Sequence, residues 1–115
     1  MLMSGNALAE IDTNLICQGQ FILYGDNAGY TKASAFVRIN KQNITISGVP
    51  FFDGKYNHGN FDTEAQMGMY KDDGLTMGTI SRIDGSIDMN YPMGANIGQL
   101  KYSFKGNCKP GKTMF

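Results

Sequence analysis

The chain has 115 residues, with ten Lys and Arg against ten Asp and Glu, so its formal net charge is zero and its length suits a single domain. Because a balanced charge lacks the basic excess that binds phosphates, we predict neither nucleic acid nor an acidic membrane as a partner. No apolar run approaches the roughly 18 residues that cross a bilayer, so we predict no membrane span.

The composition predicts an all-β fold. Fifteen glycines, three prolines and frequent turn dipeptides separate short segments rich in β-branched and aromatic residues, and no segment keeps a helical period. Turn signals recur roughly every 8 to 12 residues, which is typical of an antiparallel up-and-down barrel or sandwich of about seven or eight short strands. We favour the barrel, because closure removes exposed strand edges. The segments predicted as strands are 14–24, 31–40, 43–48, 63–70, 75–83, 86–91 and 98–105.

Residues 1–9 are similar to the end of a secretory signal peptide. They carry no charge, start with apolar residues and end in the triplet Ala-Leu-Ala at 7–9. Signal peptidase selects small side chains at the first and third positions of such a triplet, and cleavage there would leave Glu10 as the first mature residue. The alternative is a start methionine followed by a disordered tail. We therefore predict one domain over residues 10–115 and a bacterial protein that is periplasmic or secreted.

The two cysteines lie near opposite ends of this domain. Cys17 is on the first predicted strand and Cys108 follows the last. Export would place both in an oxidising compartment, where a disulfide is the default, and closing so long a loop stabilises a fold by about 4 to 5 kcal/mol in the chain-entropy model. The spacing excludes a Cys-x-x-Cys redox motif and a zinc site built from four cysteines. The alternative is a pair of buried, reduced thiols.

The second predicted strand, 31–40, has the period of two that is typical of a half-buried antiparallel strand. Its alternating positions place Ala33, Ala35, Val37 and Ile39 on one face and Lys32, Ser34, Arg38 and Asn40 on the other. Phe36 breaks this pattern. In the next strand Ile44 and Ile46 alternate with polar residues, which predicts the same half-buried arrangement.

The stretch 49–56 is the least regular, because it holds Pro50 and the turn dipeptide Asp53-Gly54. It fits an edge strand, a tight hairpin or an ordered loop. A loop protruding over 50–60 would offer a protein partner the side chains of Phe51, Phe52, Lys55, Tyr56 and His58.

Eight methionines are many for this length. Their period-two spacing assigns Met67, Met69 and Met89 to one strand face, which predicts ordinary core packing. The alternative is an adaptable lining for an apolar ligand.

The dipeptide at 84–85, Asp-Gly, is the strongest hairpin signal in the chain. A two-residue loop would place Ile80 opposite Met89 and turn Arg82 onto the same inner face. A guanidinium there needs a carboxylate, carbonyls or a bound anion, so Arg82, Ile80 and Met89 form a candidate ligand site. A three-residue turn with a bulge would instead pair Arg82 with Asp88 at the surface.

Catalytic and metal-binding motifs do not emerge from the sequence. His58 is the only histidine, so Ser-His-Asp and Cys-His arrangements lack support. The acidic residues at 62–73 lack the order of a calcium-binding loop, and the glycines lack the order that cradles phosphate. We predict a protein that is not an enzyme and that needs no metal or cofactor.

Short motifs spread over most of the predicted domain resemble a group of small exported bacterial β-proteins that has no established activity. They are Cys17-Gln18-Gly19, Gly78-Thr79-Ile80-Ser81-Arg82-Ile83-Asp84-Gly85, Tyr102, Cys108-Lys109-Pro110 and Phe115. A weaker similarity is to the periplasmic inhibitors of c-type lysozyme, which are small β-barrels with a disulfide between an early strand and the C-terminal end. Ser47-Gly48 and Gly54-Lys55-Tyr56 resemble the inhibitors' Ser-Gly and Tyr-containing loop. Their spacing differs from the inhibitors', and the chain has no tryptophan.

The leading hypothesis is a binding protein, acting on a protein partner in the manner of a lysozyme inhibitor or on a small apolar or anionic ligand, as a monomer or weak dimer. The competing hypothesis is an envelope structural or stress protein without a ligand pocket. A cavity lined by Met and Ile with Arg82 inside favours a ligand, whereas a filled interior with a protruding loop favours a protein partner.

Overall fold

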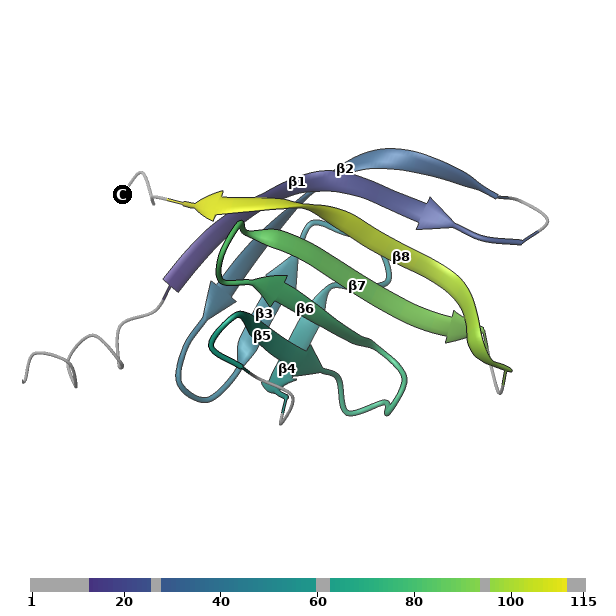
Figure 1. Ribbon diagram of the computed structural model, residues 1–115. Coiled ribbons are helices and arrows are strands. Elements are labelled where there is room, and N and C mark those ends of the chain that lie inside the picture. Colours follow the sequence, from purple (N-terminus) through teal and green to yellow (C-terminus); the bar gives the residue numbers. More distant parts are fainter. Residues whose placement is uncertain (1–12, 26–27, 60–62, 94–95, 112–115) are drawn as a thin grey trace, which may run out of the picture.

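The structure, a computed structural model, describes residues 13–25, 28–59, 63–93 and 96–111 (Figure 1). The predicted signal remnant or tail at 1–9 lies outside these residues. The described residues form one closed barrel of eight antiparallel strands in which each strand pairs with its neighbour in sequence and the last pairs with the first. The strands are β1 Thr13–Leu23, β2 Gly29–Ile39, β3 Ile44–Ser47, β4 Gly54–His58, β5 Gln66–Tyr70, β6 Met77–Ser81, β7 Ser86–Met93 and β8 Asn96–Pro110. The all-β barrel prediction is confirmed.

The barrel closes where β1 meets β8. The two strands pair from Leu15 opposite Pro110 to Leu23 opposite Tyr102, so closure involves almost the full length of β1. On its other side β1 pairs with β2 over all eleven of its residues. These three long strands form the most continuous part of the sheet (Figure 1).

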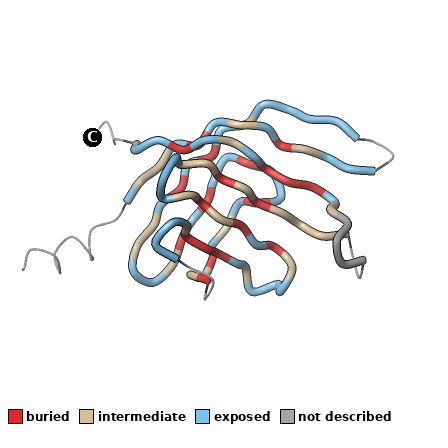
Figure 2. The backbone as a smooth tube through the Cα atoms, in the orientation of Figure 1, coloured by how far each residue is buried: buried red, intermediate tan, exposed pale blue. Residues whose placement is uncertain are grey.

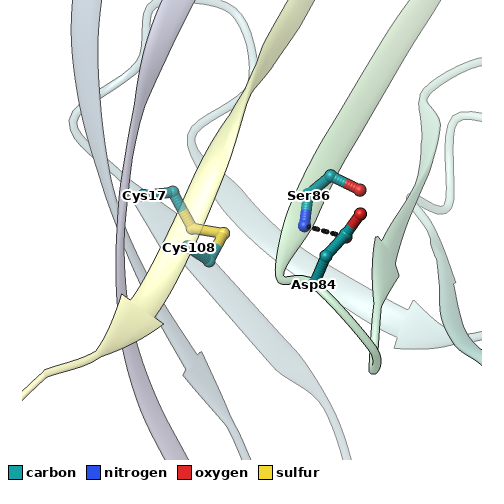
Figure 3. The surroundings of a disulfide bond; sticks show 4 residues. All are labelled: Cys17, Asp84, Ser86 and Cys108. Atoms are coloured by element: carbon teal, nitrogen blue, oxygen red, sulfur yellow. Dashed lines mark hydrogen bonds between the residues drawn. A yellow bond between two sulfur atoms is a disulfide. The ribbon is translucent and has the colours of Figure 1, made fainter.

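The predicted disulfide is present at this closure (Figure 3). Cys17 lies directly opposite Cys108, with Cα atoms 3.9 Å apart. The N–H of Gly111 donates to the carbonyl of Asn14 at 2.8 Å, so even-numbered β1 residues direct their backbone groups at β8 and odd-numbered ones do not. Cys17 therefore belongs to a non-hydrogen-bonded pair, the kind of pair in which facing side chains lie closest.

Two glycines, Gly19 and Gly106, face each other two residues along the strands from the disulfide. A Cβ atom at Gly19 would overlap the carbonyl of Lys105 and the Cα of Gly106, and one at Gly106 would overlap the carbonyl of Gln18. No residue larger than glycine fits either position unless a strand moves. The pair therefore allows β1 and β8 to approach closely beside the disulfide.

The core follows the alternation of the strands (Figure 2). Ala35 and Val37 on β2 are buried, while Phe36 between them is 40% exposed, so the residue that broke the sequence pattern lies on the outer face. The predicted core methionines are confirmed as buried: Met67, Met69 and Met89. The largest fully buried side chains are Tyr56, Phe52, Phe104, Ile44, Ile46, Met69, Ile87 and Met89.

Residues 49–56 form a turn followed by strand β4, so they are neither a protruding loop nor one continuous strand. The N–H of Phe52 donates to the carbonyl of Val49 at 3.2 Å, and Asp53 Oδ1 accepts the N–H of Val49 at 2.8 Å. A second difference lies near the C-terminus, where β8 runs without a break from Asn96 through Cys108.

Neither register considered for the β6–β7 hairpin is correct. Ile80 lies opposite Ile87 and Gly78 opposite Met89, so residues 82–85 form a four-residue connection. Ser81 Oγ accepts the N–H groups of Ile83 and Asp84, at 3.1 and 3.2 Å. A side chain that satisfies two backbone donors stabilises this longer turn against the tighter two-residue loop.

We use two names for the ends of the barrel. The terminal end is the one where β1 begins and β8 finishes, and it carries the connections after β2, β4 and β6. The aromatic end is the opposite one, where the connections after β1, β3, β5 and β7 lie.

Replacing Gly19 by alanine tests how tightly the barrel is closed. Because the new methyl group meets backbone atoms of β8, we expect Gly19→Ala to lower the free energy of unfolding by about 2 to 3 kcal/mol. Gly29→Ala is the matched control, since a Cβ there meets nothing within 4 Å and should change stability by less than about 0.5 kcal/mol. Urea unfolding of both variants with the disulfide intact measures the difference, and equal effects would contradict the close approach.

Candidate functional site

A pocket of about 360 Å³ opens at the terminal end of the barrel. Strands β1, β2, β5, β6 and β8 and the β6–β7 turn all contribute to it. Its volume lies within the roughly 300–1,000 Å³ typical of small-molecule sites. The lining residues are Thr13, Leu15, Ile39, Met67, Ile80, Ser81, Arg82, Asp84, Gly85, Cys108 and Pro110.

The pocket has an apolar wall and a polar rim. Met67 and Ile80 are 5% exposed and belong to the core, and Leu15 and Ile39 pack against them half-buried. The exposed polar residues Thr13, Arg82 and Asp84 lie where the pocket meets solvent. Such a site suits an apolar group with a polar end that stays near water.

The β6–β7 turn that forms part of the rim is tied to the disulfide. The N–H of Cys108 donates to the carbonyl of Gly85 at 2.7 Å, and Gly85 has a φ of 78° that favours glycine. Asp84 Oδ1 accepts the N–H of Ser86 at 2.9 Å (Figure 3). Hydrogen bonds from the N–H and hydroxyl of Ser86, and from the hydroxyl of Ser81, hold the pKa of the Asp84 carboxyl below its usual range.

Arg82 is on this rim and not on the inner face, so the two-residue-loop placement is wrong. Its side chain is exposed, its Nε donates to the carbonyl of Thr63 at 3.1 Å, and its N–H donates to the carbonyl of Ala65 at 2.8 Å. Arg82 thereby joins the β6–β7 turn to the segment before β5. The surface pairing with Asp88 is also absent, because Asp88 lies opposite Thr79.

Of the three residues of the candidate ligand site, the fold brings only two together. Arg82 and Ile80 both line the pocket, whereas Met89 is fully buried in the core, away from it. A Cβ atom at Gly78 would overlap Met89 Sδ, so the methionine fills the space that this glycine leaves. Packing, not ligand contact, accounts for Met89.

The candidate partner loop is not a single surface. Phe52 and Tyr56 are fully buried, and the Tyr56 hydroxyl donates to the carbonyl of Phe52 at 2.7 Å. Burial raises the pKa of that hydroxyl, as do the carboxylates of Asp73 and Asp53. Two members, Phe51 and Lys55, are exposed.

His58 lies at the terminal end, far along β4 from the turn that carries Phe51. Its Nε2 is 2.7 Å from the carbonyl oxygen of Asn40, in the connection after β2. This contact makes His58 a link between neighbouring segments.

Phe51 is the feature of the aromatic end that sequence reasoning did not anticipate. It has a φ of 70°, and it is the one described non-glycine residue with a positive φ. Pro50 before it and the bond from Phe52 to Val49 match a type II turn, whose third position favours glycine. Its ring, 61% exposed, stacks on Tyr102 with centroids 4.6 Å apart. A strained backbone that presents an exposed aromatic ring marks a second candidate site.

The aromatic stack continues inward from Phe51. Tyr102 stacks on Tyr91 at 4.8 Å, and Phe21 packs against both Phe51 and Tyr102 at 5.8 Å. The sequence contained a signal for the strain. Pro50 favours the second position of a turn, and the third position, which favours glycine in a type II turn, is occupied by Phe51. It contained no signal for the stack or for the pocket, because both join residues from distant strands.

In the part of the chain that the structure describes, no three residues of His, Cys, Asp and Glu come together to hold a metal ion. Over the same ranges, no helix is long and apolar enough to cross a membrane.

Comparisons of the chain with protein-family models, with curated proteins and with solved structures find no match. The resemblance to small exported β-proteins and to lysozyme inhibitors therefore stays a prediction. Of the residues behind the second similarity, Ser47 and Lys55 are exposed while Tyr56 is in the core.

Two substitutions at Phe51 separate its strain from its stacking. Alanine and glycine both remove the ring, but only glycine relieves the positive φ, so we expect Phe51→Gly to be more stable than Phe51→Ala by about 1 kcal/mol. Phe36, also exposed but in a regular strand, is the control, and there the glycine variant should be the less stable one. Thermal unfolding of the four variants tests this, and the same order at both positions would contradict the strain.

The Asp84 turn predicts a pH effect with a definite sign. Because the pKa of Asp84 is lowered in the folded protein, the turn is stabilised above the pKa of an Asp in an unfolded chain, and this is lost as the pH falls through the folded value. A carboxyl titration followed by NMR should give a midpoint below that of an unstructured peptide with the same local sequence. Ser86→Ala should move the midpoint up, and a midpoint at or above the peptide's would contradict the turn geometry.

Proposed function

We propose that this protein is a non-enzymatic, exported binding protein that takes a small amphiphilic ligand at the terminal end of its barrel. One observation carries the proposal: a pocket of about 360 Å³ with an apolar wall opens to solvent between the ends of five strands. Burying an apolar chain there gains about 25 cal/mol for each Å² removed from water.

The packing below the pocket sets how deep a ligand reaches. Val37, Ile44, Met69 and Met89 are fully buried and occupy the interior of the barrel. A ligand therefore lies in the mouth and does not pass through the barrel. Its polar head stays at the rim, beside Thr13, Ser81 and the guanidinium of Arg82.

The chemistry of the lining supports binding over catalysis. Of the described residues around the pocket, Arg82 and Asp84 are the ones with an ionisable side chain, since Cys108 is in the disulfide. Both already make hydrogen bonds within the loops that shape the rim. They organise the mouth, and general acid or base catalysis needs a side chain poised to exchange a proton.

The disulfide supports export. A bridge between the first and last strands persists in an oxidising compartment and is rare in the cytosol. A periplasmic or secreted location is the simplest one for this chain, and it agrees with the signal-like residues at its start.

A second candidate function is the binding of a protein partner at the aromatic end. The exposed, strained Phe51 is the observation that favours it, because aromatic side chains dominate the energetics of protein interfaces. An envelope structural protein without any ligand is the third alternative.

Filling the pocket tests the first proposal. Leu15 is half-buried in the mouth, and a tryptophan there would fill the pocket. We therefore expect Leu15→Trp to raise, about tenfold or more, the dodecanoate concentration that displaces the fluorescent probe N-phenyl-1-naphthylamine. Leu23→Trp is the matched control, since it makes the same change at the other end of the same strand.

Circular dichroism verifies that both variants fold. If the unaltered protein binds neither the probe nor dodecanoate, the result favours the alternative of an envelope structural protein without a ligand. If both tryptophan variants lose binding equally, the pocket is not the site.

A further inference from the structure

The outer surface of strands β8, β1 and β2 carries exposed lysines and amides. We call it the basic face and define it by six outward side chains, the cations Lys32, Lys105 and Lys109 and the amides Gln18, Gln20 and Asn107. All six are exposed. Strand alternation places them on the side opposite the buried Cys17, Ala35 and Phe104.

The strand register arranges these side chains in rows across the sheet. Gln20 lies opposite Lys105 on one side and Lys32 on the other, so an amide separates two cations. Gln18 lies opposite Asn107, which gives a second row with two amides. In a third row Ile16 lies between Lys109 and the exposed ring of Phe36.

Charge is unevenly distributed over the described residues, although the chain as a whole is neutral. Among the residues that the structure describes, every carboxylate lies on β7 or in the connections between β3 and β7. None lies on β8, β1 or β2. Among the described residues, the carboxylate paired with this face is that of Asp88 on β7, 3.3 Å from Lys105 Nζ, and both side chains of that pair are about half exposed, at 47% and 48%.

A groove lies at one end of the basic face, where three of its six side chains line it. It has a volume of about 450 Å³ and is lined by Ile16, Gln18, Asn107, Lys109 and Pro110. Its residues combine an apolar floor, two amides that both donate and accept hydrogen bonds, and a cation. Phe36, which lies opposite Ile16 on the neighbouring strand β2, places an aromatic ring beside this groove residue.

This combination suits a sugar ring that carries an acid group. Amides match ring hydroxyls, apolar and aromatic surfaces match the C–H faces of the ring, and a lysine ammonium forms a charge-assisted hydrogen bond with a carboxylate. Lys105 and Lys109 are four residues apart on one strand, about 13 Å, so a linear chain with repeated charges meets both. A lipid surface fits less well, since Ile16 and Phe36 are only 41% and 40% exposed and do not project for insertion.

We propose that the basic face binds a linear anionic polysaccharide that runs along β8 over this groove. The proposal is independent of the ligand at the terminal end, since the terminal pocket and the groove share only Pro110. A polyanion can bind here although the whole chain has no excess of basic residues, because Lys32, Lys105 and Lys109 are gathered on one face.

The test is affinity for an oligogalacturonate of defined length, measured by calorimetry on the full chain at low and physiological salt. Lys109→Glu should weaken binding about tenfold at low salt, because it reverses a charge at the groove. Lys55→Glu is the matched control, since it makes the same change in net charge on an exposed side chain of β4. Gln18→Leu, with no change of charge, should weaken binding about threefold, and Gln42→Leu in an exposed turn should not.

Three results would overturn the proposal. Equal loss in Lys109→Glu and Lys55→Glu would show that only net charge matters. Equal affinity for polyglutamate of the same charge would show that no sugar is recognised. Binding to phosphatidylglycerol vesicles or duplex DNA that is tighter than to the oligogalacturonate would assign the face to another polyanion. Maltodextrin of the same length, which lacks the carboxylates, should not bind.

Discussion

The pairing of β1 with β8 is the constraint on which the rest of the structure depends. It converts a meander of hairpins into a closed barrel, and it brings together residues from the two ends of the described chain. The Cys17–Cys108 disulfide and the facing Gly19 and Gly106 act together at this point. The bridge holds the strands covalently, and the absence of side chains at the glycines removes the steric obstacle to close approach.

The same pairing builds both proposed binding surfaces. Inward residues at the end of β1 and β8 form one side of the terminal pocket, and outward residues of the same strands form the basic face. The β6–β7 turn is connected to this closure by the bond from Cys108 to Gly85. Loss of the disulfide therefore acts on the pocket rim as well as on global stability.

The sequence predicted what depends on local alternation and missed what depends on several strands at once. The period of two located the buried Ala35 and Val37 and the core methionines, and a cysteine on the first predicted strand with another just after the last identified the disulfide. Arg82 was misplaced because Ser81 satisfies two backbone donors of the turn and thereby favours four connecting residues over two. Tyr56 was assigned to a surface loop, yet the chain turns early and carries it into the core.

The two ends of the barrel differ in the side chains that the structure describes there. At the aromatic end the Phe51 ring lies against Phe21 and Tyr102, two members of the buried core. Holding a phenylalanine at a φ of 70° costs free energy, of order 1 to 3 kcal/mol, which the ring contacts offset. The terminal end has no such aromatic cover among its described residues, and a pocket is open there. A ligand bound in the terminal pocket, as we propose, therefore lies beside the disulfide, at the end of the barrel opposite the strained turn at Phe51.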